Sequence, residues 1–308
     1  MRIITRLAAL MIPGFNRFKV ARLKESSESC LFEKQGNGDV EIFTRFRYAN
    51  KGNPMTVKFS ANTGFLWKEL PFLERIRHAA DNDFDALEFH DEAQDANRSA
   101  LHEVLAETGL PVLGLNCAMR DTAGCAAMAG QEAQARRDIV AAAQTASDIK
   151  AQAIHVLSGK AEGRDARTRY LSALDFALEN TPLTVLIEPI SPSKIPGYFL
   201  TNIEQAAGII RDIANPRLKI MFDCFHVMAE SGAVLEPFLA HVDMIGHVQI
   251  ASFPGRNEPG RCRPDYAQII PAFQQAGYHG AYGCEYTPSA TVEAGLGWRS
   301  TLKATLES

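Results

Sequence analysis

Short apolar runs rich in β-branched residues alternate with amphipathic stretches along residues 57–308. The apolar runs predict eight β-strands, and between them apolar residues recur every three or four positions, which indicates helices. The predicted helices include 72–80, 99–108, 132–149, 166–179 and 203–213. The predicted strands are 57–62, 86–90, 112–116, 153–157, 183–188, 218–223, 244–250 and 280–285.

This alternation of strands and helices restricts the fold. A strand that is followed by a helical crossover needs a parallel neighbour. The stretch 57–308 provides about 31 residues for each of eight units, close to the roughly 250 residues of a (β/α)8 barrel. A doubly wound sheet is the rival fold, but no G-x-G-x-x-G follows the first strand. We therefore predict an α/β protein, a (β/α)8 TIM barrel over 56–308 with an extra N-terminal segment.

The N-terminal segment 1–55 differs in charge from the rest of the chain. Through Lys51 it has ten basic and five acidic residues, which leaves 22 basic and 31 acidic residues for the remainder. The apolar run 7–11 is far too short to span a bilayer. We interpret this basic extension as an over-long gene start, with Met55 as the functional start, or as a targeting segment. A real accessory element is the third reading.

Composition narrows the class of partner. The net charge of -4 argues against a nucleic-acid binder, because phosphate backbones attract basic surfaces. The chain has six cysteines without a C-x-x-C pair, which suits a reducing compartment. We expect a cytoplasmic protein that acts on a small molecule, without a nucleic-acid or membrane partner. Assembly of the chain into a homo-oligomer is compatible with this sequence.

Polar side chains end several of the predicted strands. Glu188 closes the apolar run VLIEPI, where an unpaired carboxylate would cost several kcal/mol. In a TIM barrel the carboxyl ends of the strands meet at one mouth. Glu188, Asp223, Gln249 and Glu285 end strands five to eight, and such an oxygen-only set suits Mg2+ or Mn2+. A single strand-end acid is commonly a helix cap or ion-pair partner, but four on consecutive strands predict a metal site.

Further polar residues are candidates for substrate binding. His226 follows Asp223 by three residues and would face the substrate at such a mouth. His155 and Glu88 would either line the pocket or be satisfied polar groups of the barrel interior. The loop that follows strand seven contains Arg256 and Glu258, and an arginine fork suits a carboxylate.

These residues carry a resemblance to a known family. In their order and content the motifs resemble the hydroxypyruvate isomerase family, which belongs to the xylose isomerase-like barrels. The resemblance implies that Glu188 and Glu285 are the proton donor and acceptor, and that Glu188, Asp223, Gln249 and Glu285 hold a divalent metal. The motifs are KFSAN (58–62), LEF (87–89), LSGK (157–160), LIEPI (186–190), FDCFH (222–226), GHVQIA (246–251), PGRNEPG (254–260), GCEY (283–286) and EAGL (293–296).

Two segments depart from that family. Arg261-Cys262-Arg263-Pro264 replaces a small residue followed by Gly-Glu, so a usual acid is an arginine. The segment FHDEA (89–93) replaces an aromatic and proline run. Both segments belong to the mouth of the barrel, so the substrate stays open.

The implied chemistry is proton transfer between adjacent carbons. A carboxylate pair can remove a proton beside a carbonyl and return one, while a divalent ion stabilises the enediolate. For the conversion of hydroxypyruvate to 2-hydroxy-3-oxopropanoate, Arg256 or Lys160 would bind the carboxylate and His226 would orient a hydroxyl. The alternatives are a 2-oxo-tetronate isomerase, a ketose 3-epimerase, a nuclease like endonuclease IV, and a non-catalytic sugar-acid sensor. Gln249 and the acidic body count against the nuclease.

Overall fold

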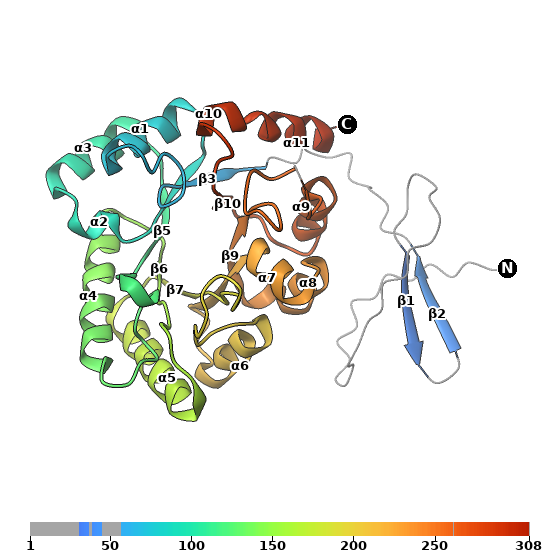
Figure 1. Cartoon of the computed structure of the whole chain (residues 1–308), viewed down its shortest axis with the longest axis horizontal. Helices are drawn as coiled ribbons and strands as arrows, with labels where there is room; N and C mark the ends of the chain where they lie inside the picture. Colours follow the sequence, from blue (N-terminus) through green and yellow to red (C-terminus); the bar gives the residue numbers. More distant parts are fainter. Residues whose placement is uncertain (1–30, 37–38, 45–56, 261, 308) are drawn as a thin grey trace. The chain divides into compact units, whose positions relative to one another are not determined.

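The computed structural model describes residues 31–36, 39–44, 57–260 and 262–307 (Figure 1). The chain divides into two units, Met1–Pro54 and Met55–Ser308. In the first unit, β1 (Leu31–Gly36) and β2 (Asp39–Thr44) form an antiparallel hairpin. The rest of the predicted extension lies outside the described residues. Its interpretation as an over-long gene start or a targeting segment therefore stays a prediction.

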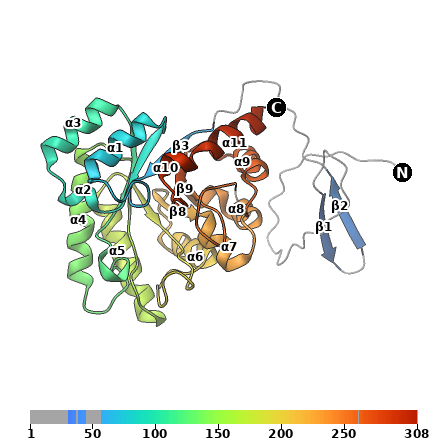
Figure 2. The ribbon, with the colours of Figure 1, turned by 45° about the horizontal axis from the view of Figure 1, so that its top comes forward.

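The second unit is a closed barrel of eight parallel strands (Figures 1 and 2). The barrel closes where the last strand pairs with the first, with Tyr282 opposite Phe59. Each strand overlaps one of the eight predicted strands, so the predicted TIM barrel is confirmed. The strands are β3 (Phe59–Asn62), β4 (Ala86–Phe89), β5 (Val112–Asn116), β6 (Ala153–His155), β7 (Thr184–Ile187), β8 (Leu218–Asp223), β9 (Ile245–Ile250) and β10 (Tyr282–Cys284).

Helices lie between successive strands and surround the barrel, as Figure 1 shows. All five predicted helices are present with small shifts at their ends. The helices are α1 (Phe72–Asp81), α2 (Glu92–Asp95), α3 (Arg98–Thr108), α4 (Glu132–Asp148), α5 (Gly163–Asn180), α6 (Ile203–Ile213), α7 (Cys224–Ser231), α8 (Leu235–His241), α9 (Tyr266–Gln275), α10 (Val292–Gly295) and α11 (Gly297–Glu307), with 3-10 turns η1 (Arg120–Thr122) and η2 (Val242–Met244).

Helix α6 illustrates how the local sequence determines an element. The side chain of Asn202 accepts a hydrogen bond from the N–H of Gln205 at 2.9 Å and so caps the helix start. Ile203, Ala206 and Ile210 are buried, and residues three or four positions apart lie on one helix face. This apolar face lets α6 pack against β8 of the barrel.

The interior of the barrel is apolar at one level and polar at the next. Ala153, Leu186 and Met221 form a small buried cluster separate from the large core between strands and helices. Side chains alternate between the two faces of a strand, so residues two positions later also face inward. On these strands the later residues are His155, Glu188 and Asp223. Polar side chains therefore lie above the apolar cluster, toward the carboxyl ends of the strands.

Candidate active site

Each of the eight barrel strands has a polar residue within one position of its carboxyl end. Seven of the eight side chains are buried, and the His90 side chain is 16% exposed. A parallel barrel gathers these ends at one mouth, which is why residues so distant in sequence come together. The eight residues are Asn62, His90, Asn116, His155, Glu188, Asp223, Gln249 and Glu285.

Three of the predicted residues form a compact group of metal-ligand types. Ligand atoms of Glu188, Asp223 and His226 all lie within 4.8 Å of one another. Asp223 Oδ1 accepts a hydrogen bond from the N–H of Phe225 at 2.7 Å, which caps α7. The second oxygen, Oδ2, faces the group and lies 3.6 Å from His226 Nε2. Asp223 therefore serves both as the helix cap and as part of the cluster.

Arg256 joins Asp223 to Glu285. Its Nη2 lies 2.6 Å from Asp223 Oδ2 and 2.5 Å from Glu285 Oε2. The guanidinium carbon lies 4.6 Å from the ring centre of Phe65 and 5.2 Å from that of Phe225. Burial opposes the charge of Arg256, but Glu285 and Asp223 outweigh burial and raise its pKa. Arg256 therefore stays charged between the two acids.

The two predicted catalytic glutamates have opposite electrostatic environments. Burial raises the pKa of Glu188 well above its usual value, and the nearby charges of Glu285 and Asp223 raise it further. Burial also acts on Glu285, but Arg256 and His90 outweigh it and lower the pKa of that carboxyl. His90 Nε2 and Asn62 Nδ2 each lie 3.3 Å from Glu285 Oε1. The surroundings of Glu188 thus oppose its negative charge, whereas those of Glu285 favour it.

The hydrogen bonds of His226 define which of its nitrogens carries the proton. The N–H of Ser191 donates to His226 Nδ1 at 3.2 Å, so Nδ1 is the unprotonated nitrogen. Burial lowers the pKa of His226 to about 4, so the neutral ring carries its proton on Nε2. Nε2 faces Glu188 Oε1 at 3.7 Å. A protonated Nε2 has no lone pair for a metal, so His226 suits donation to a substrate oxygen instead.

Glu88 lies inside the barrel rather than at its mouth. Its Oε1 accepts from Ser60 Oγ and lies 3.0 Å from His247 Nε2, while Oε2 accepts from Gln249 Nε2 at 2.9 Å. Burial alone would raise the pKa of Glu88, but His247 together with the hydrogen bonds from Ser60 and Gln249 outweighs burial and lowers that pKa. Of the two readings that the sequence left open, the geometry favours a satisfied interior group, because both oxygens of Glu88 already have donors.

His155 belongs to the ring of strand-end residues. Its Nδ1 lies 3.0 Å from Asn116 Oδ1, and its Nε2 lies 3.9 Å from Glu188 Oε2. Burial, with a smaller contribution from the charge of His90, lowers the pKa of His155 to about 3. His155 is therefore a neutral group beside Glu188.

Two further predicted residues lie apart from the carboxylate cluster. Glu258 is buried, and it accepts hydrogen bonds from the N–H and Oγ of Ser289 at 2.8 and 2.7 Å. These bonds tie the loop that follows β9 to the segment that follows β10. Lys160 is exposed, and its backbone forms a bridge with Tyr198. Substrate binding by Glu258 or Lys160 stays a prediction.

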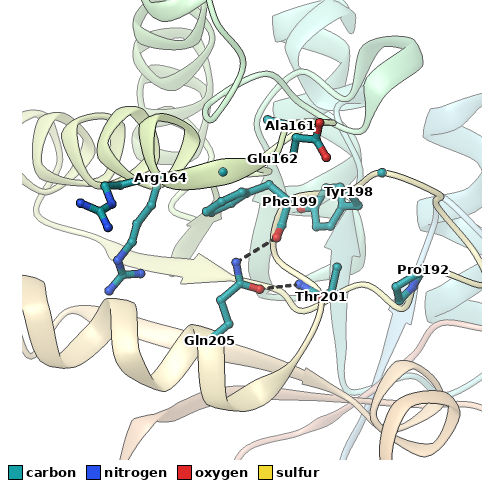
Figure 3. Close-up of a pocket in the computed structure, with 11 residues that line it drawn as sticks. Ala161, Glu162, Arg164, Pro192, Tyr198, Phe199, Thr201 and Gln205 are labelled. Atoms are coloured by element: carbon teal, nitrogen blue, oxygen red, sulfur yellow. Dashed lines mark hydrogen bonds between the residues drawn. The ribbon is translucent and has the colours of Figure 1, made fainter.

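Two cavities lie at or near the ends of the strands. A cavity of about 950 Å3 lies between the start of α5 and the loop after β7, where the side chain of Gln205 bonds the backbone of Phe199 and Thr201 (Figure 3). None of the eight strand-end residues lines it. A cavity of about 20 Å3 inside the barrel is lined by Glu88, His155 and Gln249 among others. The strand-end residues with catalytic or metal-ligating side chains therefore lie outside the lining of the larger cavity.

The sequence reasoning did not assign three residues of the site. Asn62 and His90 contact Glu285, and His247 contacts Glu88. All three occupy strand positions with the same period of two as the residues that were assigned. That shared period is the signal that identifies them.

The donor atoms fit a divalent cation. Glu188 Oε1 and Gln249 Oε1 are buried without a hydrogen-bond partner in the described structure. Arg256 pairs with Asp223 and Glu285, and Glu188 adds a third buried carboxyl group to the cluster. Carboxylate and amide oxygens are ligands that Mg2+ and Mn2+ prefer. The set of Glu188, Asp223, Gln249 and Glu285 thus has the charge deficit and the ligand type that such an ion requires.

A closed parallel barrel with an acid-lined mouth defines the class of protein, and comparisons with known proteins define the family. The family model for the xylose isomerase-like TIM barrel matches residues 76–303. The chain belongs to this family.

Curated relatives within the family are named isomerases. The chain is 36% identical over 252 residues to the 2-oxo-tetronate isomerase of Cupriavidus necator, which covers 78% of this chain and 96% of that protein. It is 33% identical over 253 residues to the hydroxypyruvate isomerase of Escherichia coli, covering 79% and 98%. A crystal structure titled AP endonuclease, family 2, from Brucella melitensis matches with a TM-score of 0.76 and 28% identity, covering 80% and 99%. The protein is accordingly an isomerase of this family.

In the part of the chain that the structure describes, no helix combines the length and the apolar character needed to cross a bilayer.

Proposed function

We propose that this isomerase moves a proton between adjacent carbons of a small hydroxy-oxo acid, with Glu188 and Glu285 as the proton-transferring groups. The observation that carries the proposal is the continuous chain of contacts between these two buried glutamates. Glu285 contacts Arg256, Arg256 contacts Asp223, and His226 lies within 3.7 Å of both Asp223 and Glu188. A substrate bound along this chain has one glutamate near each end.

The contacts of Glu285 with Arg256 and His90 favour its ionised form, which suits the base of the forward reaction. Glu285, with a lowered pKa, is the base that removes the proton beside the carbonyl. Glu188 is the partner carboxyl group that delivers a proton to the neighbouring carbon. The roles reverse in the back reaction, so one pair of carboxyl groups serves both directions.

Mg2+ or Mn2+ is the proposed cofactor, held by Glu188, Asp223, Gln249 and Glu285. When bound, such an ion supplies Lewis-acid polarisation of the substrate carbonyl. The partnerless buried oxygens of Glu188 and Gln249 support this assignment.

Arg256 and His226 are the proposed substrate-binding residues. The planar guanidinium of Arg256 matches a carboxylate, and its position over two aromatic rings limits its freedom. His226 offers its Nε2 proton to a hydroxyl or carbonyl oxygen beside Glu188. A substrate that carries a carboxylate at one end and an oxygen function beside it fits both groups.

Hydroxypyruvate, converted to 2-hydroxy-3-oxopropanoate, is the first candidate substrate. The relative named hydroxypyruvate isomerase supports it, as does the arginine in the site. A 2-oxo-tetronate is the second candidate, supported by the 36% identity to a 2-oxo-tetronate isomerase. The group of metal-ligand types found in the described residues contains a single histidine, which supports an isomerase over a nuclease with several zinc ions.

A substrate panel tests the proposal. Protein loaded with Mg2+ or Mn2+ is incubated with hydroxypyruvate, with 2-oxo-tetronates and with free ketoses, and the products are identified. We expect isomerisation of one of the acids and little turnover of the neutral ketoses. Turnover of ketoses alone would support a 3-epimerase, whereas thermal stabilisation by an acid without any turnover would support a sensor.

A further inference from the structure

The carboxamide of Gln249 has a defined orientation. The nearest terminal atom of the Gln249 carboxamide lies 2.9 Å from Glu88 Oε2. A carboxylate only accepts hydrogen bonds, so the amide must present its NH2 there. The carboxamide oxygen then points away from Glu88. That oxygen is buried and has no hydrogen-bond partner in the described residues.

The carboxylate of Glu88 reaches Gln249 across two intervening strands. Glu88 is on β4 and Gln249 on β9, with β3 and β10 between them in the closed barrel. At this level β3 contributes Ser60 and β10 contributes Gly283, which pair with each other. A Cβ on Gly283 would lie 2.3 Å from Glu88 Oε1. The small residues on these two strands therefore leave the space that the carboxylate fills.

The second oxygen of Glu88 is held by two further groups. Ser60 Oγ donates to Glu88 Oε1, and His247 Nε2 lies 3.0 Å from the same atom. All of these groups are buried. The contacts of Oε1 fix the orientation of the Glu88 carboxylate. The other oxygen, Oε2, is therefore directed toward the amide of Gln249.

We propose that Glu88 is a positioning residue that holds the Gln249 carboxamide with its oxygen toward the metal ligands. This inference rests on the metal site of the proposed function. Gln249 pairs with Asp223 in the ladder of β8 and β9, so its side chain lies beside that of a proposed metal ligand. Without Glu88, the amide is free to turn its NH2 toward that cluster, and an NH2 group does not ligate a cation.

An isosteric exchange tests the proposal. In Glu88→Gln, the new amide keeps its oxygen toward Ser60 and His247, so its NH2 faces Gln249 and the Gln249 amide turns over. We expect Mn2+ binding to weaken roughly 10- to 100-fold, the usual effect of losing a group that orients a ligand. Binding is measured from the electron paramagnetic resonance signal of free Mn2+ on the full chain. Asp138→Asn is the matched control, because Asp138 is a buried carboxylate that pairs with Arg120 outside the barrel interior.

The double variant Glu88→Gln/Gln249→Glu separates orientation from a general structural role. The amide at position 88 then donates to the carboxylate at position 249, whose other oxygen faces the metal ligands. We expect Mn2+ affinity within about threefold of wild type, which a merely structural role of Glu88 does not predict. If Glu88→Gln alone does not fold, the double variant decides, because it keeps every hydrogen bond of the network.

The outcomes are distinct. Unchanged Mn2+ affinity in Glu88→Gln, or a double variant about tenfold or more weaker than wild type, would overturn the role of Glu88 and leave the proposed function standing. A wild-type protein that binds no Mn2+ at millimolar concentration would overturn the metal site itself and with it the role of Glu88.

Discussion

Arg256 Nη2 lies 2.6 Å from Asp223 Oδ2 inside the barrel mouth, so the charge of a buried acid is balanced by a loop arginine. Arg256→Ala leaves Asp223 and Glu285 without this partner. In protein treated with a chelator, we expect the free energy of unfolding to fall by about 3 to 5 kcal/mol, because removal of one member of a buried ion pair leaves charge unpaired. Urea unfolding measures the change.

Arg77→Ala is the control for this comparison. Arg77 Nε lies 3.0 Å from Glu107 Oε2, but both side chains are exposed, so the change in stability should stay within about 0.5 kcal/mol. Equal losses in the two arginine variants would show that the buried pair does not stabilise the site.

His155 predicts a dependence of stability on pH. Burial lowers its pKa from 6.5 to about 3 in the folded protein. Below 6.5 the unfolded chain therefore takes up a proton that the folded chain does not, and stability falls with decreasing pH. This residue contributes a slope of about 1.4 kcal/mol per pH unit between the two values. The free energy of unfolding is measured from about pH 5.5 to about pH 4. In His155→Asn its decrease per pH unit should be smaller than in the wild type by about 1.4 kcal/mol.

The exposed His102 provides the comparison for this pH dependence. Its Nε2 lies 3.0 Å from Asp148 at the surface. His102→Asn removes a histidine at the surface and leaves the buried His155 in place, so the two variants are compared over the same pH range. A His155→Asn variant with the wild-type slope would mean that another group causes the loss of stability in acid.

Gly283 leaves room for the carboxylate of Glu88. A Cβ at this position would lie 2.3 Å from Glu88 Oε1, so Gly283→Ala must displace that side chain. We expect a loss of about 1 to 3 kcal/mol in stability, typical of an overpacked core, together with weaker Mn2+ binding. Gly208 in α6 has no atom within 4 Å of a built Cβ, so Gly208→Ala should stabilise the protein by about 0.5 to 1 kcal/mol. A Gly283→Ala variant as stable as the wild type would contradict this account of Gly283.

The barrel strands all lie within the unit Met55–Ser308, and Val57 at its start is buried. A chain that begins at Met55 should therefore keep the activity and the melting temperature of the full chain. Activity assays and thermal unfolding of the two chains compare them directly. Loss of most of the activity in the shorter chain would mean that the basic extension contributes to the site.

The fold and the ring of strand-end residues follow from local sequence signals. Glu188 and Asp223 each end an apolar run, and in a barrel that position alone places them at the mouth. The same alternation turns Gln249 and Glu285 inward, and Glu285 lies two residues beyond Gly283, the partner of Gln249 in the ladder of β9 and β10. Strand ends converge at one mouth whatever the details of packing, so the sequence alone places these residues there, while their catalytic and metal-binding roles stay predictions.

The contacts of Arg256 and Glu88 required the structure. Arg256 reaches Asp223 and Glu285 from a loop in which its own backbone is left-handed, with φ of 54°, and its sequence does not specify that conformation. Glu88 crosses the barrel interior only because Ser60 and Gly283 are small. Both contacts depend on the distance between strands that are far apart in sequence.

Proton exchange with solvent is the most direct test of the central claim that Glu188 and Glu285 transfer the substrate proton. The substrate identified by the panel is incubated in deuterated water with wild-type protein, Glu188→Gln and Glu285→Gln, and deuterium at the two reacting carbons is followed by nuclear magnetic resonance. We expect incorporation by the wild type and its abolition in both variants, whose circular dichroism should show a folded barrel. Incorporation at the wild-type rate in either variant would contradict the mechanism.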